Sequence, residues 1–206
     1  MNVLLINGSP HEKGCTYTAL SLIAGELNAA GIDTEILNVG TKPVGGCIGC
    51  GGCAKGNGCV FGGVVNEAIE KAKTADAFVF GTPVHYASAS GNMTSFMDRL
   101  SYAGGKYLAY KPAAICCSAR RAGTTTTLDQ LVKYPEFFHM PLVSGSYWPM
   151  VHGSNPEQVL QDQEGCAVMR ELGRNMAWLL RCIEAGKAAG ISHPENPRRS
   201  MTNFIR

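Results

Sequence analysis

Charged residues are scarce in this 206-residue chain. They make up 17 % of it, against about 25 % in typical soluble domains, and the formal net charge is only +2. A nucleic-acid-binding protein normally shows a basic excess on one face, so this balance argues against that class. The low charge fits either ordinary variation between proteins or a surface partly buried in an oligomer. The 45 % of hydrophobic residues exclude a disordered chain.

Long apolar runs are lacking too. No run approaches the roughly 18 residues that a membrane span needs. The N-terminal Met1-Asn2-Val3-Leu4-Leu5-Ile6-Asn7 has no basic segment and only four apolar residues in a row, unlike a signal peptide. We therefore expect a cytoplasmic protein without a membrane partner, whose nine cysteines are reduced thiols or metal ligands rather than disulfides.

Short apolar runs alternate with helical periods along the chain. The pattern predicts strands at residues 3–6, 32–36, 77–80, 113–117 and 142–143, separated by helices, with one long helix from Pro156 to Ala185 that Gly186 closes. Alternating β and α elements are typical of a parallel sheet covered by helices on both faces. The sequence thus predicts one α/β domain over residues 1–190, with a Cys-rich loop (45–63) after the second strand and a polar tail (191–206).

Three polar loops follow apolar strands and precede helices. They are Asn7-Gly8-Ser9-Pro10-His11-Glu12-Lys13-Gly14-Cys15-Thr16, residues 81–91 and residues 118–124. In a doubly wound sheet such loops meet at the carboxyl edge of the strands, where ligands bind. The first loop opens a helix, and its free N–H groups with the Ser9 and Thr16 hydroxyls suit a phosphate. The alternative is a purely structural role for the loop, as an ordinary turn in which Thr16 only caps the helix.

Taken together, the loop motifs resemble a known family. The patterns Gly-Ser-Pro-x(5)-Thr, Thr-Pro-Val-His-Tyr-x(4)-Gly-x(4)-Phe-Met-Asp-Arg (Thr82 to Arg99) and Ser-Ala-Arg-Arg-Ala-Gly (Ser118 to Gly123) are similar to those of the flavodoxin-like NAD(P)H-dependent FMN reductases. The cysteine cluster resembles their iron–sulfur flavoprotein branch. The resemblance implies a three-layer sandwich with five parallel strands in the order 2-1-3-4-5. It also implies at least a dimer, that is, a homodimer or homotetramer.

The resemblance also implies an FMN site. The residues expected around the cofactor are Ser9, His11, Lys13, Cys15 (through its backbone), Thr16, Tyr17, Thr82, Pro83, Val84, His85, Tyr86, Ser88, Ser118, Arg120, Arg121 and Gly123. Members of the family often carry Arg and Asn at the positions of His11 and Cys15, so this chain has less fixed positive charge near the phosphate. One of Arg120 and Arg121 is expected beside the flavin or a nicotinamide phosphate, and the alternative is solvated surface charge.

Four cysteines stand close together in the sequence. The spacing Cys47-x2-Cys50-x2-Cys53-x5-Cys59, interrupted by glycines, suits a [4Fe–4S] cluster, which needs four thiolates around a small volume. Bare thiols in a structured loop and a zinc site are the alternatives; structural zinc more often uses two separated pairs. Cys116, Cys117, Cys166 and Cys182 lie in apolar periods and are expected to be core thiols.

The predicted function is flavin-based redox chemistry without a catalytic side chain. NADH or NADPH would reduce bound FMN, and the electrons would pass to a small acceptor, a free flavin or the iron–sulfur cluster. The alternatives are an electron carrier that accepts electrons from ferredoxin, and a sensor or scaffold with an empty crevice. The aromatic segment Ser146-Tyr147-Trp148-Pro149-Met150-Val151-His152-Gly153 is expected either to cover the flavin or to anchor the last helix.

Overall fold

The computed structural model describes residues 1–56 and 58–196. In this part of the chain a six-stranded sheet has the order β2-β1-β3-β5-β6, and β4 pairs with β3 outside that path. The strands are Asn2–Asn7 (β1), Asp33–Asn38 (β2), Ala77–His85 (β3), Ser88–Ala89 (β4), Ala113–Ala119 (β5) and Met150–His152 (β6). All pairs except β3–β4 are parallel, which confirms the predicted sandwich and strand order.

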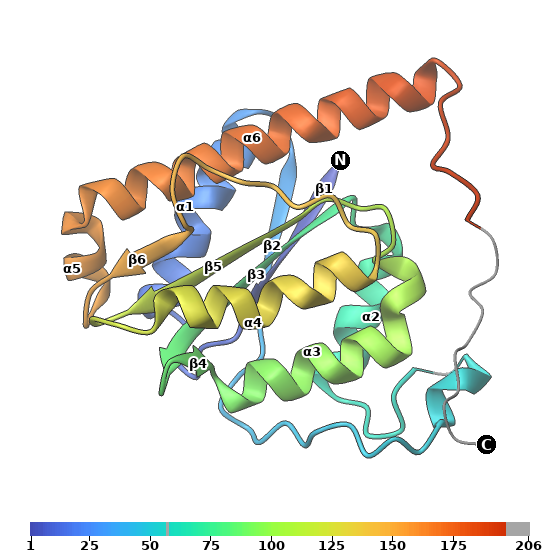
Figure 1. Cartoon of the computed structure of the whole chain (residues 1–206), viewed down its shortest axis with the longest axis horizontal. Coiled ribbons are helices and arrows are strands. Elements are labelled where there is room, and N and C mark those ends of the chain that lie inside the picture. Colours follow the sequence, from blue (N-terminus) through green and yellow to red (C-terminus); the bar gives the residue numbers. More distant parts are fainter. Residues whose placement is uncertain (57, 197–206) are drawn as a thin grey trace, which may run out of the picture.

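Helices cover both faces of the sheet (Figure 1). One face carries α1 (Cys15–Ala29), α5 (Pro156–Gln161) and α6 (Gln163–Ala188), whose apolar sides share one core with alternate residues of the strands. The other face carries α2 (Val64–Thr74), α3 (Gly91–Gly104) and α4 (Thr124–Phe137). Two short 3₁₀ helices, Gly52–Lys55 (η1) and Gly105–Tyr107 (η2), complete the helical elements of the described residues.

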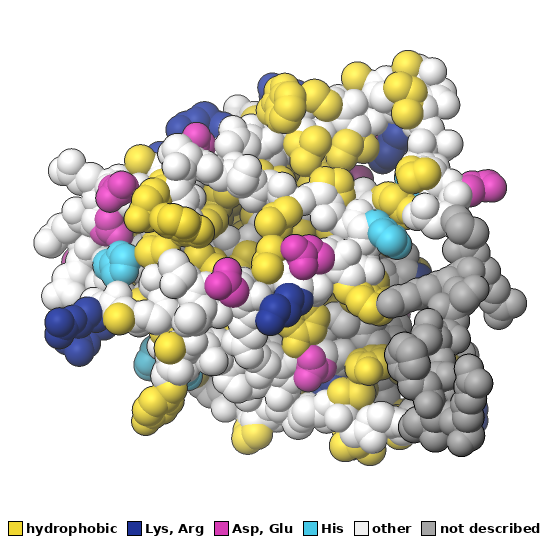
Figure 2. Space-filling model, in the orientation of Figure 1, with side chains coloured by type: hydrophobic (Ala, Val, Ile, Leu, Met, Phe, Trp, Pro, Cys, Tyr) yellow, Lys and Arg dark blue, Asp and Glu magenta, His cyan; other side chains and the backbone are white. Residues whose placement is uncertain are grey.

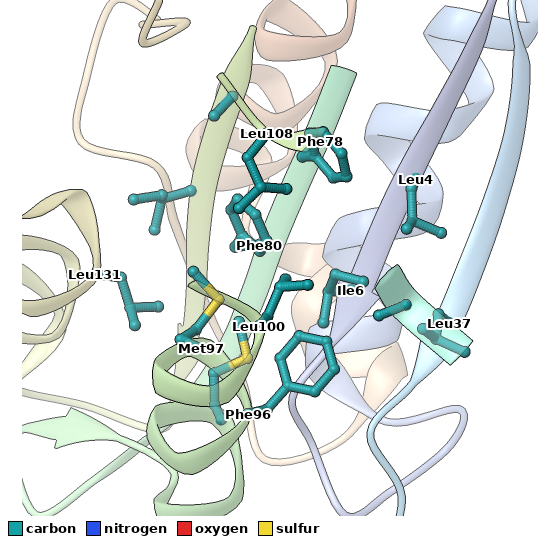
Figure 3. Close-up of a cluster of buried hydrophobic side chains, with 14 of the residues drawn as sticks. Leu4, Ile6, Leu37, Phe78, Phe80, Phe96, Met97, Leu100, Leu108 and Leu131 are labelled. Atoms are coloured by element: carbon teal, nitrogen blue, oxygen red, sulfur yellow. The ribbon is translucent and has the colours of Figure 1, made fainter. Parts of the chain in front are cut away.

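The central strands are apolar because helices cover them from both sides. Leu4 and Ile6 point to one face of β1, where they meet Phe78, Phe80 and side chains of α3 (Figure 3). The intervening β1 residues point to the α1 and α6 side. The edge strand β2 is less buried, as its alternating sequence predicts.

The predicted fifth strand at residues 142–143 is wrong. Leu142 makes only an isolated bridge with Ala113, and the last strand of the sheet is β6, eight residues further along. The segment between them is drawn toward α6, because Asn175 donates to the Ser144 carbonyl at 2.8 Å and Glu171 accepts from Ser146. The chain therefore leaves the sheet and returns to β5 at Met150.

The predicted single helix from Pro156 to Ala185 is also divided. Asn155 caps α5 as expected, but Asp162 leaves the helical conformation, and its side chain caps α6 at Gly165 N (2.9 Å). The other oxygen of Asp162 accepts from His152 N in β6 at 2.7 Å, so the break ties the helix to the sheet. The last helix continues past Gly186 to Ala188.

No helix in the described ranges is long and apolar enough to cross a membrane. The predicted polar tail is described only up to residue 196; the rest of it lies outside the described residues.

Candidate functional site

Hydrogen bonds join the three predicted ligand loops at the carboxyl edge of the sheet. The hydroxyls of Thr16 and Ser118 lie 2.8 Å apart and are buried, which links the first loop to the third. Ser90 donates to the Gly8 carbonyl at 2.7 Å and caps α3 at Met93 N, which links the second loop to the first. These hydrogen bonds hold the three loops together at this edge, as the strand order predicts.

The first loop presents the start of α1. Its N-cap, Gly14, has no side chain to bond the first turn, and the first N–H groups of a helix have no intrahelical partners. Thr18 N is the first helical amide that bonds back, to Gly14 O at 3.0 Å. Ser9 holds the turn before the helix, because its Oγ accepts from His11 N at 3.1 Å. The amides at the start of α1 therefore form a group of donors suited to an anion.

The second loop is a β-hairpin, which the sequence pattern did not predict. Strand β3 continues to His85 and turns through Tyr86 and Ala87 into β4. Both turn residues have positive φ, 50° and 58°, although neither is glycine, and the hairpin turn favours glycine there. The Tyr86 ring is fully exposed at this strained tip. Strain of this kind is concentrated at functional sites.

Gly123 shows how closely the second and third loops approach. Its φ is +94°, and a Cβ at this position would lie 2.7 Å from Ala87 Cα and 3.1 Å from a methyl group of Val84. Thr126, one turn into α4, donates to the Ala87 carbonyl at 2.8 Å. The hairpin tip therefore rests on the start of α4.

The predicted cofactor residues divide into a buried floor and an exposed rim. Buried are Ser9, Thr16, Thr82 and Ser118; partly buried are Cys15, Tyr17, Pro83, Val84, Ser88 and Gly123; exposed are His11, Lys13, His85, Tyr86, Arg120 and Arg121. The hydroxyls of the floor are held by bonds within the protein. The rim carries the cations and the aromatic ring that a ligand at this edge would meet.

The four clustered cysteines lie around one cavity. This cavity has a volume of about 250 Å³ and is lined by Cys47, Ile48, Gly49, Cys50, Gly51, Cys53, Cys59, Val60, Phe61, Arg99, Tyr102 and Ala103. The loop leaves β2 and runs beneath α3 in Figure 1. Within residues 1–56 and 58–196, no group of three or more Cys, His, Asp or Glu side chains is arranged to hold a metal ion.

Side chains of two helices hold Cys59, and neither of them has a role that the sequence predicted. Asn66 of α2 accepts from Cys59 N at 2.8 Å and donates to Cys59 O at 3.0 Å. Arg99 of α3 donates from Nε to Cys59 Sγ at 3.2 Å. The sequence contains one signal that could have pointed to Arg99. This residue ends the Phe-Met-Asp-Arg motif and is a cation on an otherwise apolar face of the helix.

Helix α3 connects the cavity to the predicted ligand loops. Asn92 in its first turn holds residues 40–44 through bonds to Gly40 O, Lys42 O and Val44 N, and Arg99, two turns later, bonds the Gly45 carbonyl. The first turn adjoins the predicted ligand loops, whereas the cavity lies at residues 99–103. At about 1.5 Å per residue, the two places are roughly 12–18 Å apart along the helix.

Of the four predicted core thiols, three are buried. Burial raises the pKa of Cys116 well above the ordinary thiol range and that of Cys117 to about 12. Cys182 is exposed, so that prediction is wrong. It lies two residues beyond the buried Leu180 of α6 and therefore outside the apolar stripe that faces the core. Cys15 is partly buried, and burial raises its pKa as well, which disfavours a thiolate beside the first loop.

The aromatic segment after residue 142 anchors α6 through the contacts of Ser144 and Ser146. Tyr147 and Trp148 pack edge to face and remain half exposed. They help to line an open cavity of about 410 Å³ against α4. Figure 2 shows hydrophobic side chains gathered on this face between α4 and α6.

Known proteins resemble this chain in both sequence and fold. An iron-sulfur flavoprotein of Methanocaldococcus jannaschii is 28 % identical over 193 residues, which cover 89 % of this chain and 100 % of that protein. One of Archaeoglobus fulgidus is 29 % identical over 197 residues, 91 % of this chain and 96 % of that protein.

Among solved structures, RosB with a bound 8-demethyl-8-formylriboflavin-5'-phosphate intermediate superposes with a TM-score of 0.70 at 14 % identity over 100 % of this chain and 93 % of that one. An NADH:FMN oxidoreductase in its apo form gives 0.61 at 18 % identity over 88 % and 89 %. These likenesses show the flavodoxin-like fold. The family described as NADPH-dependent FMN reductase matches residues 1–155, and the chain belongs to that family.

Proposed function

We propose that this protein binds FMN at the carboxyl edge of the sheet and works as an NAD(P)H-dependent flavin oxidoreductase. The observation that carries the proposal is the buried Thr16–Ser118 hydroxyl pair, which holds the start of α1 against the third loop. It brings a phosphate-binding helix terminus and a rim of cations to one place. Bound FMN would supply the redox chemistry: it accepts a hydride at N5 and releases electrons to an acceptor.

The residues present fit the phosphate of FMN. The amides of Cys15, Thr16 and Tyr17 lie in the first turn of α1, where helical carbonyl partners are lacking. The positive end of the helix dipole favours a dianion there. Lys13, exposed in the same loop, adds a positive charge near the phosphate. In this role Cys15 acts through its backbone, and its raised pKa keeps the side chain uncharged.

The rim residues would contact the flavin ring and the nicotinamide substrate. Arg120 and Arg121 follow β5 directly and are exposed, so one of them can meet the negative charge of a reduced flavin or of a nucleotide phosphate. His85 and Tyr86 stand at the tip of the hairpin on the neighbouring strand. We propose that they flank the ring and exclude water from one side of it.

The cysteine cavity contains the four ligands that an iron–sulfur cluster needs. All four cysteines line one space of about 250 Å³. A [4Fe–4S] cluster binds one thiolate at each iron atom, so its ligands surround a volume instead of a point. We propose that Cys47, Cys50, Cys53 and Cys59 hold such a cluster, which exchanges electrons with the flavin.

Steady-state oxidation of NADH and NADPH by the FMN-loaded protein tests the enzymatic proposal. Turnover with either nucleotide is expected, with free flavin or a small quinone-like molecule as acceptor. Absence of turnover with both nucleotides, together with flavin reduction by reduced ferredoxin, would support the alternative of an electron carrier. A colourless protein that does not bind added FMN would contradict both redox functions.

We also propose a homo-oligomer, either a dimer or a tetramer. Large apolar side chains are exposed on and near α6, including Trp178, Trp148 and Leu160, and the overall charge is low. Size-exclusion chromatography with light scattering measures the mass. A mass of one 21.9-kDa chain would contradict this part of the proposal.

A further inference from the structure

We infer that Arg99 is a positioning residue that raises the reduction potential of the redox centre in the cysteine cavity. The inference rests on the proposed iron–sulfur function and assigns a role to a side chain outside the four ligands. The observation behind it is direct contact between the guanidinium and a ligand sulfur, since Arg99 Nε donates to Cys59 Sγ at 3.2 Å.

Arg99 is a buried cation without a carboxylate partner. Its residue is only 5 % exposed, and no ion pair involves it in the described part of the chain. The adjacent acid, Asp98, instead accepts from the Tyr134 hydroxyl at 2.5 Å. Burying an uncompensated charge is costly. A site that keeps this cation buried is therefore suited to an anion in the neighbouring cavity.

The cavity supplies that anion only through its thiols. Its lining contains four cysteines, Tyr102 and Arg99 but no Asp or Glu. Four thiolates around a [4Fe–4S] centre give a net negative charge, which grows by one unit when the centre takes up an electron from the flavin or from a reduced ferredoxin-class carrier. No bond breaks and no proton moves in that step. The buried cation stabilises the reduced state more than the oxidised state, so it raises the potential.

The geometry favours arginine over lysine. While Nε faces Cys59, Nη2 donates to Gly62 O at 2.9 Å and Nη1 to Gly45 O at 3.4 Å, so one planar group spans both ends of the cysteine loop. The Phe61 ring covers the guanidinium, with 5.3 Å between the ring centroid and Cζ. A lysine keeps the charge but lacks this fixed fork of donors.

The test is a redox titration of the reconstituted protein, followed by the electron paramagnetic resonance signal of the reduced centre. Arg99→Met is expected to disfavour one-electron reduction about tenfold, a fall in midpoint potential of about 59 mV. Arg99→Lys is expected to show a smaller fall. The control is Arg174→Met, which removes an arginine on α6 that pairs with Glu26 and is expected to leave the potential unchanged. An unchanged potential in Arg99→Met, with full iron content, would overturn the inference and leave the proposed function standing.

A second measurement needs no substitution. In wild-type protein produced with ¹⁵N-labelled arginine, electron–nuclear double resonance of the reduced centre should detect a ¹⁵N hyperfine coupling. Only a guanidinium nitrogen close to the centre couples measurably to its unpaired electron. Absence of any coupling would overturn the inference even where Arg99→Met fails to fold. A wild-type protein that takes up no iron but binds FMN would instead refute the cluster itself, and the role of Arg99 with it.

Discussion

The hydroxyls of Thr16 and Ser118 lie 2.8 Å apart although 102 positions separate them in the chain. This bond fixes the start of α1 against the loop after β5. We predict that Thr16→Val and Ser118→Ala each weaken FMN binding about five- to thirty-fold, because a lost buried hydrogen bond costs roughly 1–2 kcal/mol. Isothermal titration with FMN measures the effect.

The double variant tests whether the two hydroxyls act together. If they do, the double variant binds FMN about as weakly as either single variant. If the losses of FMN-binding free energy in the two single variants add in full in the double variant, the two residues act independently, which would contradict this prediction. Thr18→Val is a suitable control, since that hydroxyl bonds only the Gly14 carbonyl of its own helix.

The close approach at Gly123 predicts a strong effect of one added methyl group. Gly123→Ala requires a side chain at φ +94° and places Cβ 2.7 Å from Ala87 Cα. We expect the free energy of unfolding to fall by about 1–3 kcal/mol. Gly25→Ala is the matched control in the interior of α1, where Cβ meets nothing within 4 Å. It should stabilise the protein by up to about 1 kcal/mol, and equal effects of the two variants in urea denaturation would refute the argument.

The buried thiols of β5 predict a loss of stability in alkaline solution. Burial raises the pKa of Cys116 and Cys117 in the folded state above the 9.0 of an ordinary thiol. Above about pH 9 the unfolded chain therefore releases protons that the folded chain keeps, so unfolding becomes easier as pH rises. Each group contributes a slope of up to about 1.4 kcal/mol per pH unit.

Urea denaturation between pH 7 and 10.5 measures this dependence. Cys117→Ala should lower the free energy of unfolding at pH 7. It should also reduce the slope of that free energy against pH above about pH 9 by about the contribution of one thiol. A slope that is the same in this variant and in the wild type would show that other groups cause the alkaline loss.

Asn66 makes two hydrogen bonds to the Cys59 backbone, and we therefore predict that it stabilises the conformation of the cysteine loop. Asn66→Ala removes two hydrogen bonds to the Cys59 backbone, so the apo protein should lose order at this residue. Alkylation of Cys59 by iodoacetamide, read by mass spectrometry, is expected to become several-fold faster, while Cys116 stays unreactive. Asn66→Asp retains the acceptor for Cys59 N and should fall between the two. Unaltered alkylation in Asn66→Ala would mean that Arg99 alone holds the residue.

The sequence predicted the elements that depend on local periodicity. Strands β1, β3 and β5 follow from their apolar runs, and the helix start at Pro156 follows from its Asn155 cap. The departures depend on distant contacts. Asp162 breaks the last helix because it also bonds β6, and residues 144–149 leave the sheet because α6 binds them. No local pattern contains those partners.

The candidate site shows the same division. The order of the predicted elements gave the positions of the ligand loops. The spacing of the four cysteines predicted that they lie around one site. The hairpin at Tyr86 was missed because its turn lacks the glycine that marks such turns. Arg99 belongs to a sequence motif, but its role does not follow from the sequence, because its contact with Cys59 joins residues 40 positions apart. Cys182 has an apolar setting in the sequence, but it lies two residues beyond the buried Leu180, which places it on the solvent-facing side of α6.

The most direct test of the account is the content of iron, acid-labile sulfide and FMN in protein purified and reconstituted without oxygen. The account predicts about four irons and four sulfides per chain together with one bound FMN, and loss of the iron but not of the FMN when Cys59 is replaced by alanine. Substoichiometric iron after reconstitution would contradict the cluster in the cavity lined by Cys47, Cys50, Cys53 and Cys59.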